Sequence, residues 1–183
     1  MESLNSKTVK HKVMDILKAA TDWAKAELFS TPFFMLFGGV FMAASLGFWQ
    51  LGKTEMAKAY IIPTLVAGAL LLIIGLGLFF TNKSRITQFE TMYNADASAF
   101  VASELARAEA TLTEYKNIVF TAIPLIIAAC ALVIFLVNSP IWRASMITSI
   151  AMLVVILLID GTAHARIDAY HQHLLSVEND MKK

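Results

Sequence analysis

The chain has 183 residues, of which 57% are hydrophobic and 16% are charged, and its mean hydropathy is +0.64. A soluble domain is about 45–50% apolar and about 25% charged, so the composition excludes an ordinary soluble domain and predicts an integral membrane protein. A net charge of +1 excludes the strongly basic surface that nucleic-acid binding needs.

The first segment, residues 1–29, is predicted to form an amphipathic helix in the cytosol. Its apolar residues recur every three or four positions, which is the spacing of one helix face, and they are Val9, Val13, Ile16, Ala20 and Trp23. This helix is expected either to lie on an anionic membrane surface or to pack on the other cytosolic helices. Packing is favoured because acidic residues interrupt the basic face.

Residues 30–81 are predicted to form the first two transmembrane helices. The Ser-Thr-Pro sequence at 30–32 predicts a helix start, because a hydroxyl caps a helix and proline loses nothing at the first helical position. The second helix is predicted over residues 56–80, with two further turns in water. Small side chains let a neighbouring helix approach closely, so the first helix is expected to pack through Gly39, Ala43 and Gly47.

A single long helix is predicted from residue 97 to residue 137, after a turn and cap at Asn94-Ala95-Asp96. Residues 82–116 are predicted to form a cytosolic helical extension, and residues 117–159 are predicted to form transmembrane helices 3 and 4. The long helix therefore begins in the extension and continues as transmembrane helix 3. Its cytosolic part carries an apolar seam formed by Val101, Leu105, Ala108 and Leu112. Pro124 predicts a kink, because proline removes one backbone hydrogen bond and crowds the preceding turn. The Asn-Ser-Pro sequence that ends at Pro140 predicts the start of the fourth helix.

Residues 160–183 are predicted to continue the fourth helix as a cytosolic C-terminal extension. Its apolar seam is formed by Ala163, Ile167, Tyr170, Leu174, Val177 and Met181. Twelve of the fifteen Lys and Arg residues lie in the N-terminal segment, the 82–116 segment and this tail. The positive-inside rule therefore places both termini in the cytoplasm. The predicted fold is an all-α integral membrane protein of the inner membrane, with four transmembrane helices. Helices 2–4, above all 3 and 4, extend into a cytosolic bundle joined by the N-terminal helix.

The most promising polar cluster is predicted just below the membrane. Asp168 and His171 have the carboxylate-x-x-His spacing that puts two ligands on one helix face. Counting about 1.5 Å per residue from the membrane exits places acidic groups of three helices at similar depths. Such groups bind Zn²⁺, Fe²⁺ or Mn²⁺, and the candidate metal ligands are Glu90, Glu109, His164, Asp168 and His171. The alternatives are a pH-sensitive histidine cluster and an ordinary solvated face with ion pairs such as Glu104–Arg107.

Few sequence features indicate catalysis. The transmembrane segments lack charged residues at their centres, which disfavours a pump or secondary transporter, and no nucleophile, phosphate-binding or HExxH motif is found. The leading hypothesis is a non-enzymatic assembly, anchoring or regulatory subunit that needs no cofactor. It would bind a protein partner or itself through the cytosolic stalk, with a homodimer favoured. The alternatives are a metal-dependent membrane enzyme or sensor at the five residues above, and an oligomeric pore.

Overall fold

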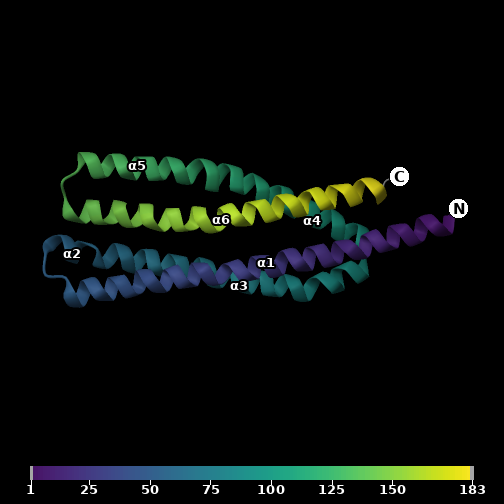
Figure 1. Cartoon of the computed structure of the whole chain (residues 1–183), viewed down its shortest axis with the longest axis horizontal. Helices are drawn as coiled ribbons and strands as arrows, with labels where there is room; N and C mark the ends of the chain where they lie inside the picture. The colour runs from purple at the N-terminus through teal and green to yellow at the C-terminus, as the bar shows by residue number, and fades with distance from the viewer. Residues whose placement is uncertain (1, 182–183) are drawn as a thin grey trace.

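The computed structural model describes the backbone of residues 2–181 and the side chains of residues 15–179. Its helices are α1 (Glu2–Leu51), α2 (Glu55–Ala59), α3 (Ile61–Ala95), α4 (Ala97–Glu114), η1 (Tyr115–Ala122), α5 (Ile123–Leu136) and α6 (Pro140–Met181). These elements form four antiparallel helical lengths (Figure 1). The first is α1, the second is α2 with α3, the third is the continuous run of α4, η1 and α5, and the fourth is α6. The short connections at 52–54 and 137–139 share one end of the bundle, and both termini lie toward the other.

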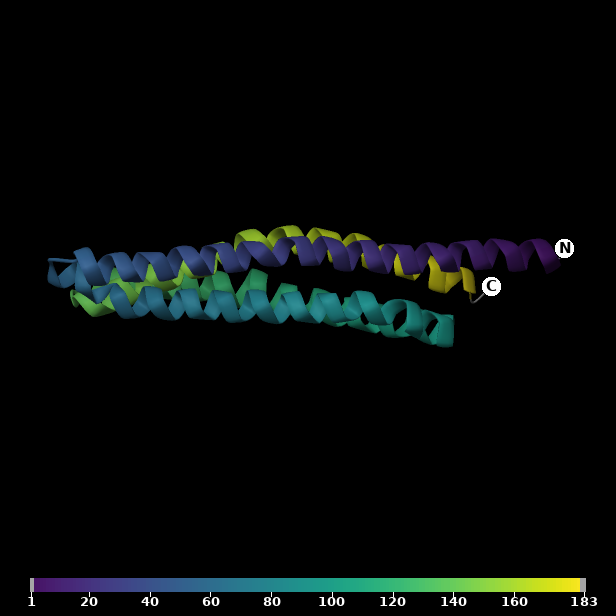
Figure 2. The same cartoon turned by 90° about the horizontal axis from the view of Figure 1, so that it is seen from below.

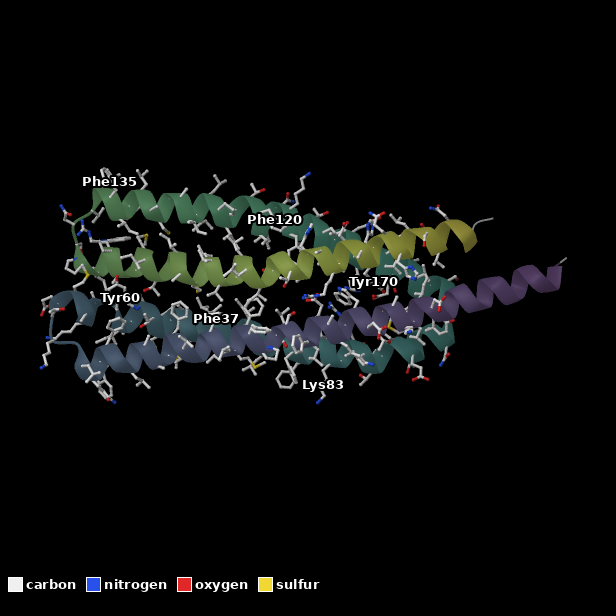
Figure 3. The ribbon with its side chains drawn as sticks, viewed as in Figure 1. Phe37, Tyr60, Lys83, Phe120, Phe135 and Tyr170 are labelled. Carbon is white, nitrogen blue, oxygen red and sulfur yellow. The ribbon has the colours of Figure 1, made fainter. Side chains whose placement is uncertain are left out.

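The two ends of the bundle differ in character. The half that ends in the short connections, here called the apolar half, exposes many large hydrophobic side chains, and Phe135 on α5 is 85% exposed. Figure 3 shows Phe135 pointing away from the bundle. The chain contains four helical lengths long and apolar enough to cross a membrane, which indicates a multipass membrane protein. They are Asp15–Leu51, Glu55–Ala95, Ala97–Leu136 and Pro140–Asn179.

The other half, here called the polar half, holds most of the buried core. Among the side chains of residues 15–179, thirteen buried hydrophobic residues form its core, whereas the core of the apolar half has four. The apolar seams predicted for the N-terminal helix, for α4 and for the end of α6 meet in this core, for instance at Ile16, Val101 and Leu174. Toward its outer end, α1 and α6 form one layer and α3 and α4 form the other (Figure 2). The stalk seams are therefore filled from within one chain.

The predicted helix start at residues 30–32 is not present, because α1 continues through it. The Ser30 hydroxyl donates to the carbonyl of Ala26, and the Thr31 hydroxyl donates to the carbonyl of Leu28. Both hydroxyls thus bond back to the preceding turn, which is the alternative to capping that serine and threonine have inside helices. The N-terminal segment and the first apolar segment consequently form one continuous helix.

Two other predicted helix boundaries are confirmed. Asp96 caps α4, because its carboxylate accepts hydrogen bonds from the backbone N–H groups of Ser98 and Ala99. These bonds hold the pKa of Asp96 below its usual value. Pro140 is the first residue of α6, where its missing N–H costs nothing.

Two prolines perturb their helices. A perturbation was predicted at Pro124, though not its π-helical form, and none was predicted at Pro63. The second helix is divided at Tyr60, three residues before Pro63, whose ring crowds the preceding turn. Before Pro124 the chain forms the π-helical segment η1, in which the Thr121 hydroxyl donates to the carbonyl of Lys116, five residues earlier. A wider π turn makes room for the proline ring, and such turns are frequent at functional sites.

The predicted small-residue stripe is not the face that packs within the chain. A Cβ atom added to Gly39 or Gly47 would meet nothing within 4 Å. The neighbouring Gly38 instead faces Gly68, where an added Cβ would lie 2.9 Å from the carbonyl oxygen of Gly38. Helices α1 and α3 therefore pack closely through glycines one position away from the predicted stripe.

We expect Gly68→Ala to destabilise the protein and Gly39→Ala to leave it unchanged or slightly more stable. The new methyl group at residue 68 must push α1 and α3 apart, which costs about 1–3 kcal/mol in a packed core. At residue 39 it meets open space and gains only helix propensity. Thermal unfolding in the same detergent compares the two variants, and equal melting temperatures would contradict the close contact.

Candidate functional site

A buried carboxylate organises the polar half. Glu104 on α4 is 5% exposed, and its carboxylate accepts two hydrogen bonds from the Arg107 guanidinium, one of them from Nε at 3.0 Å. The Tyr170 hydroxyl of α6 donates a third hydrogen bond, also at 3.0 Å. The predicted Glu104–Arg107 ion pair is therefore confirmed, and burial followed by the Glu104 carboxylate raises the pKa of Tyr170.

Aromatic stacking connects this ion pair to α1. The Trp23 ring stacks on the Tyr170 ring with 5.6 Å between centroids and 12° between planes. The Arg107 guanidinium lies 4.2 Å from the Trp23 centroid, a favourable cation–π distance, and Arg85 of α3 approaches the same ring at 6.0 Å. Side chains from all four helical lengths thus meet in one closed network.

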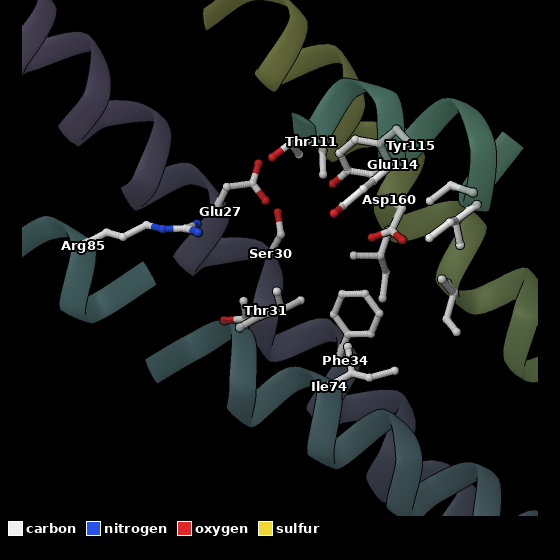
Figure 4. A pocket seen from close by; sticks show the side chains of 16 residues that line it. Glu27, Ser30, Thr31, Phe34, Ile74, Arg85, Thr111, Glu114, Tyr115 and Asp160 are labelled. Carbon is white, nitrogen blue, oxygen red and sulfur yellow. The ribbon is translucent and has the colours of Figure 1, made fainter. Parts of the chain in front are cut away.

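A chamber lies beside this network, toward the apolar half. Smaller side chains lie seven positions from Trp23, Glu104 and Tyr170 on the same helices, on the side of the apolar half. The space between the helices is therefore incompletely filled there. The resulting cavity has a volume of about 380 Å³ and is lined from α1, α3, α4, η1 and α6 (Figure 4). The smaller residues are Ser30, Thr111 and Ala163, and all of them line the cavity.

The chamber has a charged side and an apolar side. Figure 4 shows the carboxylates of Glu27, Glu114 and Asp160 around one space, with Phe34 and Ile74 beneath them. The remaining apolar lining comes from α3, η1 and α6 and consists of Leu78, Ile118, Val119, Ile156, Ile159 and Ala163. This lining is that of a site for an amphipathic molecule.

The three carboxylates differ in their partners. Glu27 is paired with Arg166, whose Nε lies 3.0 Å from the carboxylate and whose Nη2 donates to the Ser30 hydroxyl at 2.8 Å. Asp160 and Glu114 form no hydrogen bond or ion pair with any residue whose side chain the structure describes. Arg85 of α3 also lines the chamber, but its guanidinium donates to Asn82 and not to these carboxylates. Asp160, which is half-buried, and Glu114, which is exposed, therefore have no paired cation.

Burial makes the charge on Asp160 unfavourable. Burial, followed by repulsion from Glu27, raises the pKa of Asp160 to about 6. Burial and the Asp160 carboxylate also raise the pKa of Tyr115, so that its phenol keeps its proton at neutral pH. Asp160 is thus partly protonated near pH 6 and gains the most from a bound positive charge.

The structure brings together two of the five predicted metal ligands. Nε2 of His171 lies 3.6 Å from the Glu109 carboxylate, slightly beyond hydrogen-bond distance. His164 packs edge-on against two aromatic rings, while Glu90 and Asp168 are exposed on α3 and α6. Among residues 15–179 no three His, Cys, Asp or Glu side chains gather as a metal site would require. Metal binding at these residues stays a sequence prediction.

Comparisons with protein-family models, curated proteins and solved structures find no match for this chain. The candidate site consequently depends on its own geometry. Sequence reasoning had assigned Trp23 and Tyr170 to apolar seams and had not singled out Glu27 or Arg166. The last two are 139 positions apart, and no local pattern indicates such a pair.

We expect Glu104→Gln to destabilise the protein by about 3 kcal/mol, because it leaves the Arg107 guanidinium without its counter-charge in a largely buried place. Tyr170→Phe removes one hydrogen bond to a charged group and is expected to cost about 1.5 kcal/mol. Denaturant unfolding in detergent measures both values. If Tyr170→Phe were the more damaging variant, the carboxylate would not be the centre of the network.

Asp160→Asn is expected to stabilise the protein more at pH 7.5 than at pH 4.5. The folded-state pKa of about 6 exceeds the unfolded value of about 3.9. The folded state therefore holds the proton more tightly, and wild-type stability falls as the pH rises from about 4 to about 6. The variant has no carboxyl group at residue 160 and does not lose this stability. Its free energy of unfolding, relative to that of wild type, should therefore grow by about 2 kcal/mol between pH 4.5 and pH 7.5.

The measurement is the free energy of unfolding of wild type and variant at each pH in the same detergent. Asp168→Asn is the matched control, because Asp168 is an exposed carboxylate on the same helix. An equal effect of Asp160→Asn at pH 4.5 and pH 7.5 would contradict the raised pKa.

Proposed function

We propose that this protein is a four-span protein of the inner membrane with both termini and the α3–α4 connection in the cytoplasm. Three observations support this topology. The two short connections lie at one end of the bundle, and the exposed apolar side chains lie in the same half. The Lys and Arg residues concentrate at the opposite end, which is the cytoplasmic end by the positive-inside rule.

In this topology the chamber lies at the cytoplasmic membrane interface. The stretch of α6 from Pro140 to Ile159 is about 30 Å long at 1.5 Å per residue, which matches the hydrocarbon thickness. Asp160 follows directly, and it lines the chamber. The apolar side of the chamber then lies at the depth of lipid chains, and the charged side lies at the depth of lipid head groups.

The proposed function is non-enzymatic binding in this chamber of an amphipathic molecule with a positively charged head. The observation that carries the proposal is the half-buried Asp160 carboxylate, which has no ion-pair partner although Arg85 lines the same chamber, and which lies above an apolar floor. The exposed Glu114 adds a second unpaired carboxylate at the same space. An ammonium group supplies the missing charge, and an attached hydrocarbon chain fits against Phe34 and Ile74. Because every helical length lines the chamber, its occupant would bridge them, as a regulatory ligand does.

Partner binding through the stalk is the part of the sequence hypothesis that the fold supports least. The stalk seams are filled by the chain's own helices, as at Val101 and Leu174. Self-association stays a prediction. The outward stripe formed by Gly39, Ala43 and Gly47 has no neighbour in the chain at its two glycines and is the face on which a second copy would pack.

Cysteine accessibility tests the topology and the chamber together. In full-length protein with Cys130→Ala, reconstituted in vesicles of known orientation, Thr111→Cys should react with a membrane-impermeant methanethiosulfonate from the cytoplasmic side. Lys53→Cys in the short connection should react from the opposite side. Decylammonium should slow the reaction at residue 111 at least fivefold, because the bound molecule occupies the space that the thiol lines.

Thr113→Cys provides the matched control. Thr111 and Thr113 lie on the same helix and each bonds to the carbonyl four residues back, but only Thr111 lines the chamber. Any change in membrane surface charge affects both thiols, so protection of both would overturn chamber binding. Decyl sulfate should protect neither, and Asp160→Asn should remove the protection at residue 111. Reaction of both Thr111→Cys and Lys53→Cys from one side would overturn the topology.

A further inference from the structure

A second cavity lies in the apolar half, between α3 and α6. This groove has a volume of about 410 Å³, and its walls are mainly hydrocarbon, including Val66 and Leu70 of α3 and Met152 of α6. It begins about one helical turn from the chamber, because Leu70 and Met152 precede the chamber residues Ile74 and Ile156 by four positions, but the two cavities share no lining residue. Three hydroxyl side chains of α6 interrupt the apolar lining, and they are Ser145, Thr148 and Ser149.

These hydroxyls lack hydrogen-bond partners. Thr148 is 4% exposed, and its Oγ1 atom is buried without a hydrogen bond. Ser145 and Ser149 likewise form none with the residues whose side chains are described. The other buried hydroxyls that the structure describes all donate a hydrogen bond, as Thr31 and Thr64 do to the preceding turn and Ser45 does to the carbonyl of Ile61. Thr148 therefore departs from the other buried hydroxyls of the described chain.

An unpaired hydroxyl is costly at this depth. Thr148 lies eight positions into α6, about 12 Å along the helix axis from its start, so in the proposed topology it lies within the hydrocarbon layer. Lipid tails offer no hydrogen bond there, and a buried polar group without a partner is unfavourable. A molecule that brought oxygen atoms to this point would satisfy the hydroxyls while its hydrocarbon remained against the groove walls.

We infer that the groove between α3 and α6 binds an uncharged lipid that carries carbonyl or hydroxyl oxygens next to its hydrocarbon chains. Because Oγ1 of Thr148 is buried, the side chain rotates to donate its hydroxyl to a carbonyl oxygen of this lipid. Ser145 and Ser149 lie close enough along α6 to hold a second oxygen. The lipid is uncharged because no charged side chain lines the groove. Acylglycerols and substituted quinones share this chemistry.

A second copy of the chain is a weaker occupant for the groove. A packing helix would bring mostly hydrocarbon to the hydroxyls, because its backbone carbonyls are already bonded within that helix. The outward glycine stripe on α1 is a better face for close helix contact, since it exposes backbone without any unsatisfied hydroxyl.

Native mass spectrometry of the full chain, released from detergent, tests the inference directly. Dioctanoylglycerol and a decyl-substituted benzoquinone represent the two sources, and hexadecane is the ligand without oxygen. We expect at least one of the two oxygen-bearing lipids to add to the wild-type monomer in a one-to-one ratio, and hexadecane not to add. Thr148→Val, which keeps the shape and removes the hydroxyl, should lower the bound fraction about tenfold at subsaturating lipid.

Thr64→Val is the matched control, because Thr64 is equally buried in the same half but already bonds to its own helix. It should retain wild-type binding. Equal binding by wild type and Thr148→Val, or equal retention of hexadecane, would overturn the inference. A dimer that Thr148→Val dissociates would also overturn it, in favour of a second copy in the groove. Circular dichroism and melting temperature show whether each variant is folded.

Discussion

The fold of the polar half depends on keeping the Glu104 carboxylate paired. A buried charge without a partner costs several kcal/mol, and this one receives its hydrogen bonds from α4 and α6 while Trp23 of α1 covers its arginine. A slip of any of these helices by one residue would turn one partner away. The network therefore fixes the rotation and axial position of three helices, and the chamber inherits its place from them.

In the proposed topology, the same helices meet two different environments along their length. In the polar half, apolar side chains must be removed from water, and Ile16, Phe100 and Leu174 form a well-buried core. In the apolar half, the proposed hydrocarbon environment would remove that requirement, and there α5 packs mainly on α6 and leaves residues such as Phe135 exposed. Tight contact there comes instead from glycines, as where Gly68 meets α1.

Sequence patterns predicted the positions of most helices and predicted less well which helix faces meet. The Asp96 cap and the Pro140 start depend on local chemistry and were predicted. The close contact at Gly38 was not, because Gly38 and Gly39 differ by only one step around the helix and the partner decides between them. Counting residues likewise predicted a depth for Asp168, but depth does not specify the rotation of the helix, and Asp168 is exposed.

Sequence analysis did not predict the chamber, because no local pattern indicates that its lining residues meet. It exists because Ser30, Thr111 and Ala163 occupy seam positions where larger residues would close the core, and each is unremarkable alone. The chamber differs from the neighbouring network in the pairing of its buried carboxylate. Glu104 accepts hydrogen bonds from Arg107 and Tyr170, whereas the partly buried Asp160 has no paired cation. The fold therefore pairs one carboxylate and leaves the other without a counter-charge.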